Sequence, residues 1–218
     1  MIQLHNISKL YDKNIKALDN ISLSFKEGEL VILKGVSGSG KSTILSLIAG
    51  LCKPTQGEVI VDGKKISKLP DHFAAAYRRD HIGIVFQRYN LISSLSVEEN
   101  VLLPLFPLNL TRSVMQERAN RVLEKFHIAH KQALIVKNLS GGEQQRVAIA
   151  RANINDPKII LADEPTANLD EKLSREFIAI LKELKSQKRT IVVATHDPLF
   201  FDLDFVDRTI EIEHGKLL

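Results

Sequence analysis

The stretch GVSGSGKST at residues 35–43 constrains this chain more than any other part of its 218 residues. It matches the pattern G-x-x-x-x-G-K-[ST], in which glycines let the backbone turn tightly and point its N–H groups at an anion. Lys41 adds a mobile positive charge for phosphate oxygens, and Ser42 offers a small hydroxyl to Mg²⁺. An apolar run, LVIL at residues 30–33, precedes the loop, and a helical pattern follows it. This order predicts a phosphate site at a helix N-terminus, where the macrodipole favours negative charge.

A Gly/Ser-rich turn is the alternative interpretation of this stretch, but it explains neither the strand before it nor the helix after it. We therefore expect the whole loop to contact a nucleoside triphosphate. The predicted contacts are Gly35, Ser37, Gly38, Ser39, Gly40, Lys41, Ser42 and Thr43.

Composition restricts the setting in which such a loop works. No apolar stretch approaches the roughly 20 residues that cross a bilayer, and the start of the chain does not resemble a signal peptide. The single cysteine, Cys52, allows no internal disulfide, which is typical of a reducing, cytoplasmic protein. The net charge is +4, but Lys and Arg are scattered, so we expect no nucleic-acid partner.

Apolar periodicity predicts alternating strands and helices, and hence an α/β fold with a mostly parallel sheet. The middle of the chain reads as helical and carries no evident strand. We therefore expect a single domain over residues 1–218, with a core built from residues 1–87 and 157–218 and a helical subdomain inserted at residues 88–156. The expected strands cover residues 2–11, 17–25, 29–34, 58–61, 81–87, 158–164 and 190–196, with a hairpin turn at His214-Gly215. The expected helices after the loop cover residues 71–79, 111–126 and 171–187.

Polar side chains follow the apolar strand patterns at Gln87, at Asp163-Glu164 and at His196. Ligands of parallel sheets lie beyond the carboxyl ends of the strands, so these groups are expected beside the phosphate loop. Asp163 would hold Mg²⁺ together with Ser42 and Gln87, and Glu164 would accept a proton from the attacking water or orient it. His196 would hydrogen-bond the γ-phosphate and that water. The structural alternatives are a helix cap for the carboxylate pair and a satisfied core histidine for His196.

The stretch LSGGEQQR at residues 139–146 is the other strong signal. Ser140 and Glu143 predict a capping box for a following helix. A cap does not require Gly141 and Gly142, because each glycine costs about 1 kcal/mol inside a helix. Two glycines at a helix start permit an anion to approach the backbone closely. One site does not need two helix N-termini, so we expect Ser140, Gly141 and Gly142 to serve the nucleotide of a second subunit.

Taken together, these motifs closely resemble those of ABC transporter nucleotide-binding subunits over essentially the whole chain. The resemblance covers Walker A (residues 35–43), the Q-loop (Gln87), the signature motif (residues 139–143), Walker B with Glu164, the D-loop (residues 167–170) and the switch His196. It implies a RecA-like ATPase core with an N-terminal antiparallel β part. It also implies that Tyr11 stacks on adenine, and that a homodimer holds two ATP and Mg²⁺ with Asp170 contacting ATP in trans.

A finer resemblance, carried by residues 78–105 and by LADEPTANLD, points to the lipoprotein-releasing and macrolide-exporter ATPases. It implies an integral membrane permease as partner, a periplasmic adaptor reached through that partner, and a place at the cytoplasmic face of the inner membrane. The unfused chain is typical of the lipoprotein-releasing layout. Departures at residues 153–155 and 127–138 bear on the substrate.

Alternatives remain open for the function and for one segment of the sequence. The chain could serve a binding-protein-dependent importer or be a cell-division ABC ATPase. A soluble ABC ATPase acting on DNA or ribosomes is disfavoured, because neither coiled coils nor zinc motifs are evident. The leucine-rich residues 91–110 are either the core of the helical subdomain or a groove for a membrane-subunit helix.

Overall fold

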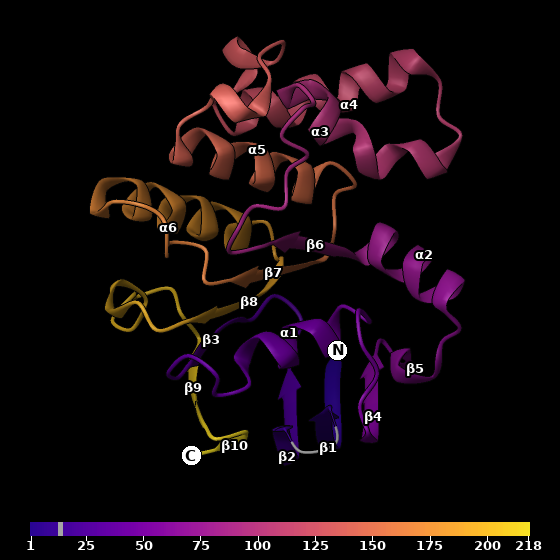
Figure 1. The fold of residues 1–218 in the computed structure, drawn as a ribbon, viewed down its shortest axis with the longest axis vertical. Helices are drawn as coiled ribbons and strands as arrows, with labels where there is room; N and C mark the ends of the chain where they lie inside the picture. The colour runs from indigo at the N-terminus through magenta and orange to yellow at the C-terminus, as the bar shows by residue number, and fades with distance from the viewer. Residues whose placement is uncertain (13–14) are drawn as a thin grey trace.

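The computed structural model describes residues 1–12 and 15–218, and the strands within them form two sheets (Figure 1). The first sheet is antiparallel, with strand order β2-β1-β4-β5. The second has the order β10-β9-β3-β8-β7-β6, and its neighbouring strands from β9 to β6 are parallel. The strands are β1 (Ile2–Tyr11), β2 (Ile15–Phe25), β3 (Leu30–Lys34), β4 (Gln56–Val61), β5 (Lys64–Lys65), β6 (Ile82–Val85), β7 (Ile159–Asp163), β8 (Thr190–Thr195), β9 (Arg208–Glu213) and β10 (Lys216–Leu217).

Most of the helices begin where the sequence offers a polar cap. The α-helices are α1 (Lys41–Ile48), α2 (Asp71–His81), α3 (Val97–Leu102), α4 (Arg112–Lys125), α5 (Gly141–Asn153) and α6 (Glu171–Ser186). Four of them start after a residue whose side chain accepts a hydrogen bond from the backbone N–H three positions on: Ser96, Thr111, Ser140 and Asp170. The expected helices are confirmed, with ends shifted by one or two residues. None of the helices in residues 1–12 and 15–218 combines the length and the apolarity that crossing a membrane requires.

The central strands of the parallel sheet, β3, β7 and β8, are buried on both faces because each alternates between two clusters of apolar side chains. In β3, Val31 and Leu33 pack on the side of α1, in a cluster that also takes residues of the antiparallel sheet. Leu30 and Ile32 face the other side, where α5 and α6 pack. Helix α1 therefore lies between the two sheets, and the helical part of the chain covers the opposite face (Figure 1). The predicted α/β class with an antiparallel β part is confirmed.

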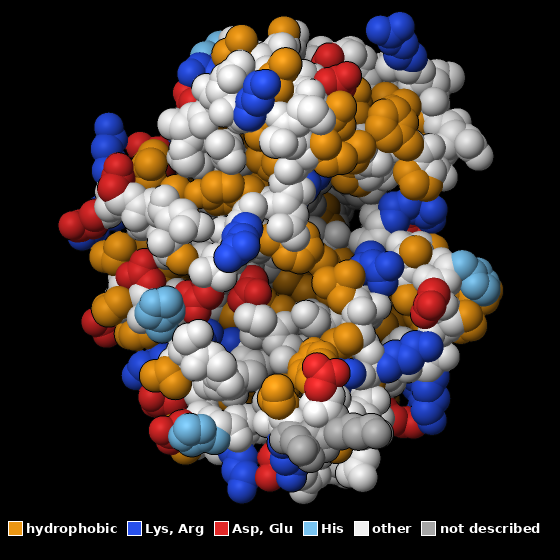
Figure 2. Space-filling model, viewed as in Figure 1, with side chains coloured by type: hydrophobic (Ala, Val, Ile, Leu, Met, Phe, Trp, Pro, Cys, Tyr) orange, Lys and Arg blue, Asp and Glu red, His pale blue; other side chains and the backbone are white. Residues whose placement is uncertain are grey.

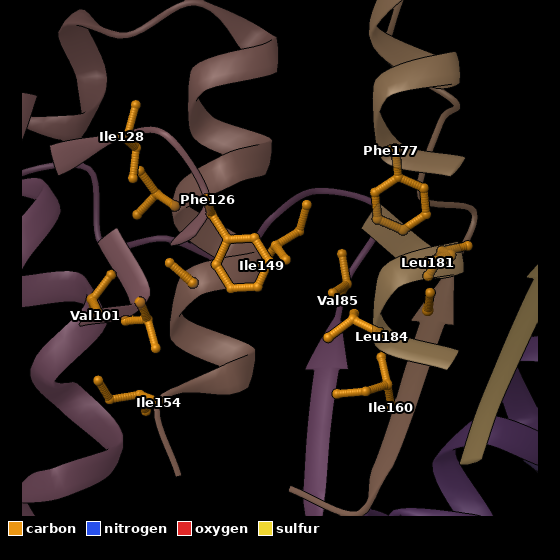
Figure 3. Packing of buried hydrophobic residues seen from close by; sticks show 14 of the residues in the cluster. Val85, Val101, Phe126, Ile128, Ile149, Ile154, Ile160, Phe177, Leu181 and Leu184 are labelled. Atoms are coloured by element: carbon orange, nitrogen blue, oxygen red, sulfur yellow. The ribbon is translucent and has the colours of Figure 1, made fainter. Parts of the chain in front are cut away.

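Residues 88–156 contain α3, α4 and α5 and none of the ten strands. Their core is continuous with that of the sheet face beneath them. Figure 3 shows Phe126 and Ile128 around Ile149 of α5, and Phe177 of α6 above the strands β6 and β7. The division of the chain at residues 87/88 and 156/157 stays a prediction.

Strand β1 departs from simple alternation. Ile2 and Leu4 are buried, and the next buried residue on that side is Ile7 rather than residue 6. The pairing of β1 with β2 shifts register between Leu4 and Ile7, where Asn6 has φ 48°. A β-bulge therefore inserts one residue and returns the apolar residues to the core.

Candidate functional site

The phosphate loop connects β3 to α1 and is shaped by close contacts behind it. Gly40 has φ 109°, and a Cβ there would lie 2.6 Å from the carbonyl oxygen of Ala17. Gly38 also has a positive φ, of 81°. No atom lies within 4 Å of its Cβ position, so the loop is open on this side. The back of the loop is thus fixed by β2, while its front is free for an anion to approach.

The C-terminal hairpin also supports this loop, which the sequence analysis did not anticipate. The N–H of Gly215 donates to the carbonyl oxygen of Ser39 at 3.0 Å. A Cβ at Gly35 would lie 2.3 Å from the carbonyl oxygen of Ile212, two residues before the His214-Gly215 turn. The only signal in the sequence was the His214-Gly215 turn, and its position behind the loop depends on the pairing of β9 with β3.

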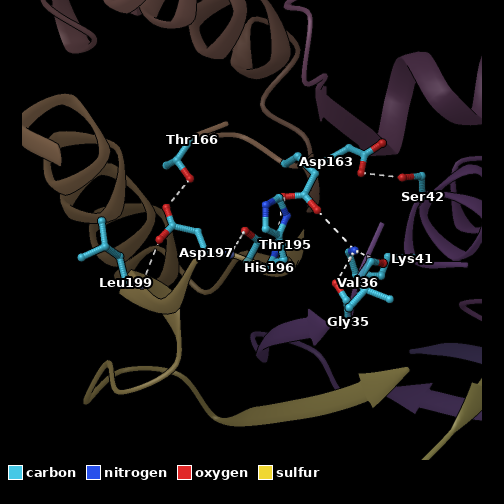
Figure 4. Close-up of polar contacts among 11 residues, drawn as sticks. Gly35, Val36, Lys41, Ser42, Asp163, Thr166, Thr195, His196, Asp197 and Leu199 are labelled. Carbon is cyan, nitrogen blue, oxygen red and sulfur yellow. Dashed lines mark hydrogen bonds and ion pairs between the residues drawn. The ribbon is translucent and has the colours of Figure 1, made fainter. Parts of the chain in front are cut away.

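Lys41 is the central charge of the site. It is only 4% exposed, and its ammonium donates to the carbonyl oxygens of Gly35 at 2.7 Å and Val36 at 3.1 Å (Figure 4). The same nitrogen lies 3.3 Å from a carboxylate oxygen of Glu164. Because Lys41 has rotatable donors on a flexible stem, phosphate oxygens can replace some of these partners.

Ser42 and Asp163 come together where the loop meets the end of β7. The Ser42 hydroxyl donates to Asp163 Oδ1 at 2.8 Å (Figure 4). Burial raises the pKa of the Asp163 carboxyl, and the charge of Glu164 acts in the same direction. A hard divalent cation would relieve this charge, and hydroxyl and carboxylate oxygens are suitable Mg²⁺ ligands. These residues therefore fit a Mg²⁺ ion that takes its remaining ligands from nucleotide and water. In the described residues no group of three or more His, Cys, Asp or Glu side chains could hold a metal ion by itself.

The raised pKa of Asp163 predicts a conflict between stability and function. Because the folded-state pKa lies above the unfolded value, ionised Asp163 destabilises the fold above the folded-state pKa and has no such effect below the unfolded-state one. We therefore expect Asp163→Asn to raise the free energy of unfolding by about 0.5–2 kcal/mol at pH 7, the range of common stabilising substitutions. The gain should shrink once the pH falls below the folded-state pKa and vanish below the unfolded-state one, while Mg²⁺-dependent hydrolysis is lost at every pH.

Thermal unfolding in Mg²⁺-free buffer at pH 7 and at acid pH measures the gain in stability, and phosphate release measures hydrolysis. Asp204→Asn is the control, because that carboxylate is 81% exposed and should change neither quantity. A variant that is less stable at pH 7 would contradict the argument from burial.

Glu164 lies one residue beyond β7 in a strained backbone conformation, with φ 42°. Its N–H donates to the carbonyl oxygen of Ala194 at 2.8 Å, which ties it to β8. One carboxylate oxygen faces Lys41, and the other lies 3.0 Å from Nδ1 of His196. Backbone strain of this kind persists only where the surrounding structure fixes it. Here it accompanies a Glu164 carboxylate that points toward Lys41 of the phosphate loop. The structure therefore brings Glu164, His196 and Lys41 together, as expected.

Asp197, the residue after His196, makes contacts that the sequence analysis missed. Asp197 accepts from the hydroxyl of Thr166 at 2.7 Å and from the N–H of Leu199 at 3.0 Å (Figure 4). Its own N–H donates to the Thr195 hydroxyl at 3.0 Å. Asp197 thus ties the end of β8 to the segment that follows Glu164. The Asp-Pro pair at residues 197–198 was the available signal, because Asp before Pro favours a cap.

Gln87 is placed differently from the prediction. Strand β6 ends at Val85, so Gln87 lies in the following turn rather than at the strand end. Its side chain is exposed, and its carbonyl oxygen accepts from the amide of Asn168 at 3.0 Å. The strand is shorter because the chain turns after Phe86, whose carbonyl oxygen accepts from the N–H of Tyr89. Among the described residues no contact joins the Gln87 side chain to Ser42 or Asp163.

Ser140, Gly141 and Gly142 lie at the start of α5, on the sheet face opposite α1. The expected capping box is present, because Ser140 accepts from the N–H of Glu143, whose side chain accepts from the N–H of Ser140. No contact among the described residues connects these three residues to the phosphate loop of the same chain. Asp170 caps α6 through the N–H of Leu173. The two segments are thus separate from the site of their own chain.

Tyr11 lies at the end of β1, near the start of α1. It is 39% exposed, and its hydroxyl lies 3.8 Å from Cys52 Sγ. Burial raises the pKa of its phenol, and the neighbouring Cys52 acts in the same direction. The structure places the phenol beside Cys52, and the stacking of Tyr11 on adenine stays a prediction.

The fold and the site together define a phosphate-loop ATPase. The phosphate loop, the Ser42–Asp163 pair and the Glu164–His196 pair lie together at the carboxyl ends of the parallel strands β3, β7 and β8. The chain belongs to the ABC transporter family, whose model matches residues 18–167. The predicted family and the ATPase class are confirmed.

Comparison with curated proteins identifies close relatives. The chain is 41% identical over its whole length to the macrolide export ATP-binding/permease protein MacB of Hyphomonas neptunium. It is 40% identical over its whole length to MacB of Salmonella typhimurium. It spans about a third of these relatives, because the match covers 34% of each of them.

Solved structures match as closely. The dimeric ATP-binding cassette MJ0796, in a post-hydrolysis state bound to ADP and Pi, has a TM-score of 0.92 at 42% identity, with 100% of this chain and 96% of that chain covered. The cbiO1 cassette of Clostridium perfringens, part of the ABC transporter complex cbiONQ, has a TM-score of 0.86 at 30% identity, with 100% and 86% covered.

Proposed function

We propose that this chain binds ATP and Mg²⁺ between two copies of itself and uses hydrolysis to drive a membrane permease. The observation that carries the dimer is the difference between Gly141 and Gly142. A Cβ at Gly142 would lie 2.7 Å from the side chain of Leu173, so internal packing accounts for that glycine. A Cβ at Gly141 would meet nothing closer than 3.6 Å. Glycine at 141 therefore has no reason inside the chain, and close approach of a partner's nucleotide supplies one.

In this mechanism the chain's own residues have separate tasks. Backbone N–H groups of residues 35–43 and Lys41 bind the phosphates, and Tyr11 stacks on the adenine. Ser42, Asp163 and Gln87 would hold Mg²⁺, which would neutralise charge on the phosphoryl group. Glu164 takes a proton from water, and His196 orients Glu164 and the γ-phosphate. Ser140, Gly141, Gly142 and Asp170 contact the ATP of the other copy. The dimeric MJ0796 cassette with ADP and Pi supports this arrangement.

Alanine substitutions at the two glycines test the dimer. We expect Gly141→Ala to keep or raise the melting temperature, because alanine is up to about 1 kcal/mol better than glycine in a helix. It should nevertheless abolish ATP-driven dimerisation, measured by light scattering with a slow ATP analogue. Gly142→Ala should instead destabilise the chain by about 1–3 kcal/mol through crowding against Leu173. Normal dimerisation of Gly141→Ala would refute the contact in trans.

We further propose that the partner is a permease of the macrolide-exporter or lipoprotein-releasing type, with a periplasmic adaptor reached through it. The identity of 40–41% to two MacB proteins over the whole of this chain supports this group. The chain would then lie peripherally at the cytoplasmic face of the inner membrane, where ATP is available. We favour less the alternative that the chain is a cell-division ABC ATPase, which would also act on a membrane partner.

A surface for that partner lies between α2 and the helical segment. A hollow of about 260 Å³ is bounded by Arg78, Phe86, Pro104 and Arg151, among others. Phe106, two residues after Pro104, is 60% exposed. Figure 2 shows apolar side chains gathered over this part of the molecule. In residues 91–110 the two expected roles are divided. Val97, Val101 and Leu105 belong to the core, which confirms that alternative for them, and Phe106 remains free to contact a partner.

The partner is tested by capture. A tagged Glu164→Gln chain, held with ATP, is used to purify bound proteins from detergent-solubilised membranes. A permease with few spans and a large extracytoplasmic domain would support the proposal. A permease of many spans together with a binding protein would replace it with the importer. Ribosomes or DNA alone would refute a transport role and leave the ATPase.

A further inference from the structure

Arg151, in the last turn of α5, makes a contact that the mechanism above does not use. Its two terminal nitrogens donate to two successive carbonyl oxygens, those of Tyr89 at 2.6 Å and Asn90 at 2.5 Å. The partners are 61 and 62 positions away in the sequence. One guanidinium therefore fixes two adjacent peptide groups, and a planar fork with several donors is suited to this task.

The charge of Arg151 is not explained by a salt bridge. Among the described residues no carboxylate forms an ion pair with it, its partners are two backbone carbonyl oxygens, and burial lowers the pKa of the guanidinium. A half-buried cation with neutral partners is costly, and an apolar side chain of similar length would pack there more easily. The compensation is the pair of charge-assisted hydrogen bonds, which depends on the position of Tyr89 and Asn90.

The backbone that Arg151 holds is strained and follows Gln87 directly. Tyr89 and Asn90 have φ of 58° and 49°, in the left-handed region that side-chain-bearing residues adopt at a cost in free energy. Two such residues in succession persist only where their surroundings fix them. On the other side, the Asn168 amide donates to the carbonyl oxygen of Gln87 at 3.0 Å. The Gln87 segment is thus held between the D-loop and α5.

The same segment also contacts the other end of α5. The Tyr89 side chain is 9% exposed, its hydroxyl is buried without a hydrogen-bond partner, and it lies 3.6 Å from the Cβ position of Gly141. Tyr89 therefore contacts the first turn of α5 through its side chain and the last turn through its carbonyl oxygen. A shift of α5 along its axis would move both contacts, and with them the backbone after Gln87.

We propose that Arg151 is a positioning residue that holds the backbone after Gln87, and so the Gln87 side chain, in register with α5. The proposal rests on the role of Gln87 given under the proposed function. The helix α5 begins with the residues that contact ATP in trans. The position of the Gln87 side chain therefore depends on where the second copy holds this helix. Arg151 thereby acts on the turnover rate rather than on nucleotide affinity.

The test compares Arg151→Met, Arg151→Lys and Gln87→Ala, with the double variant of Arg151→Met and Gln87→Ala, in the full chain. Arg118→Met is the matched control, since Arg118 is also half-buried in the helical segment and makes no hydrogen bond or ion pair in the part of the chain that the structure describes. We expect Arg151→Met to lower kcat roughly tenfold, because misplacing a positioned group by a fraction of an ångström costs that order of rate. KM for ATP should stay within about twofold. Arg151→Lys should restore part of the loss, because it keeps the charge and loses the fork.

Two readouts separate positioning from a general loss of structure. Amide hydrogen exchange in residues 86–92 should become about tenfold faster in Arg151→Met and stay unchanged in Arg118→Met. The double variant should be no slower than Gln87→Ala alone, because residues that act through one another are not additive. An additive double variant, or an Arg151→Met chain with normal kcat and exchange, would overturn the proposal. If Gln87→Ala itself turns over normally, the role of Gln87 fails instead. If Arg151→Met does not fold, Arg151→Lys decides by the same two readouts.

Discussion

Glu164→Gln is expected to slow ATP hydrolysis by roughly 10²–10⁴-fold, the usual contribution of a general base. Glutamine keeps the shape of the side chain, but its amide cannot accept a proton from water. The strained backbone at φ 42° and the N–H bond to Ala194 are independent of the carboxylate, so the fold should be retained. Lys41, which lies 3.3 Å from this carboxylate, would lose a competing anion and remain available to phosphate.

The same variant should therefore bind ATP at least as tightly as the unchanged chain and accumulate as a dimer. Phosphate release at saturating Mg–ATP, equilibrium nucleotide binding and light scattering measure the three quantities. Glu117→Gln serves as the control, because Glu117 is 69% exposed on α4 and, within residues 1–12 and 15–218, pairs only with Arg121. Turnover within about tenfold of the unchanged chain would remove Glu164 from the role of base.

The residues that the sequence placed correctly are those whose position follows from local order. A loop after a buried strand and before a helix lies at the carboxyl end of a parallel sheet, and so do Asp163-Glu164 and His196. Their convergence required only that β3, β7 and β8 be neighbours. Apolar periodicity predicted the strands themselves, but it does not locate the β1 bulge at Asn6, where one extra residue shifts the pairing with β2.

The contacts that the sequence did not predict all join distant segments. Gly215 supports Ser39 because β9 pairs beside β3, and Arg151 reaches Tyr89 because α5 packs over the end of β6. No periodicity records which carbonyl oxygen an arginine will meet. Gln87 shows the limit of local reasoning in another way. Its apolar run predicted a strand up to residue 87, but the turn fixed by Phe86 and Tyr89 ends β6 at Val85.

Lys41→Ala is expected to weaken ATP binding by roughly 10–100-fold, the range for losing hydrogen bonds to a charged donor. The reason is geometric. The ammonium donates to the carbonyl oxygens of Gly35 and Val36 within the loop. The loop is open at Gly38, where an anion can approach. Because Lys41 reaches the outer phosphates, affinity for ADP should fall less than affinity for ATP, and affinity for AMP should not change.

The substitution should also destabilise the chain, by about 2–3 kcal/mol, because Glu164 is left partly buried without its cation. Two measurements distinguish this loss of stability from the loss of ATP affinity. Urea unfolding without nucleotide measures stability, and binding is measured well below the unfolding transition. Lys34→Ala is the matched control, since Lys34 lies at the end of the strand that feeds the loop. Its ammonium pairs with Glu211 at 3.5 Å and lies over the ring of Phe201. If Lys41→Ala were destabilised as expected and still bound ATP normally, the lysine would be a structural counter-ion to Glu164 and the phosphates would be held by the backbone of the loop alone. Equal losses for ATP, ADP and AMP would instead indicate a collapsed loop. Only a loss graded by phosphate number assigns Lys41 to the β- and γ-phosphates.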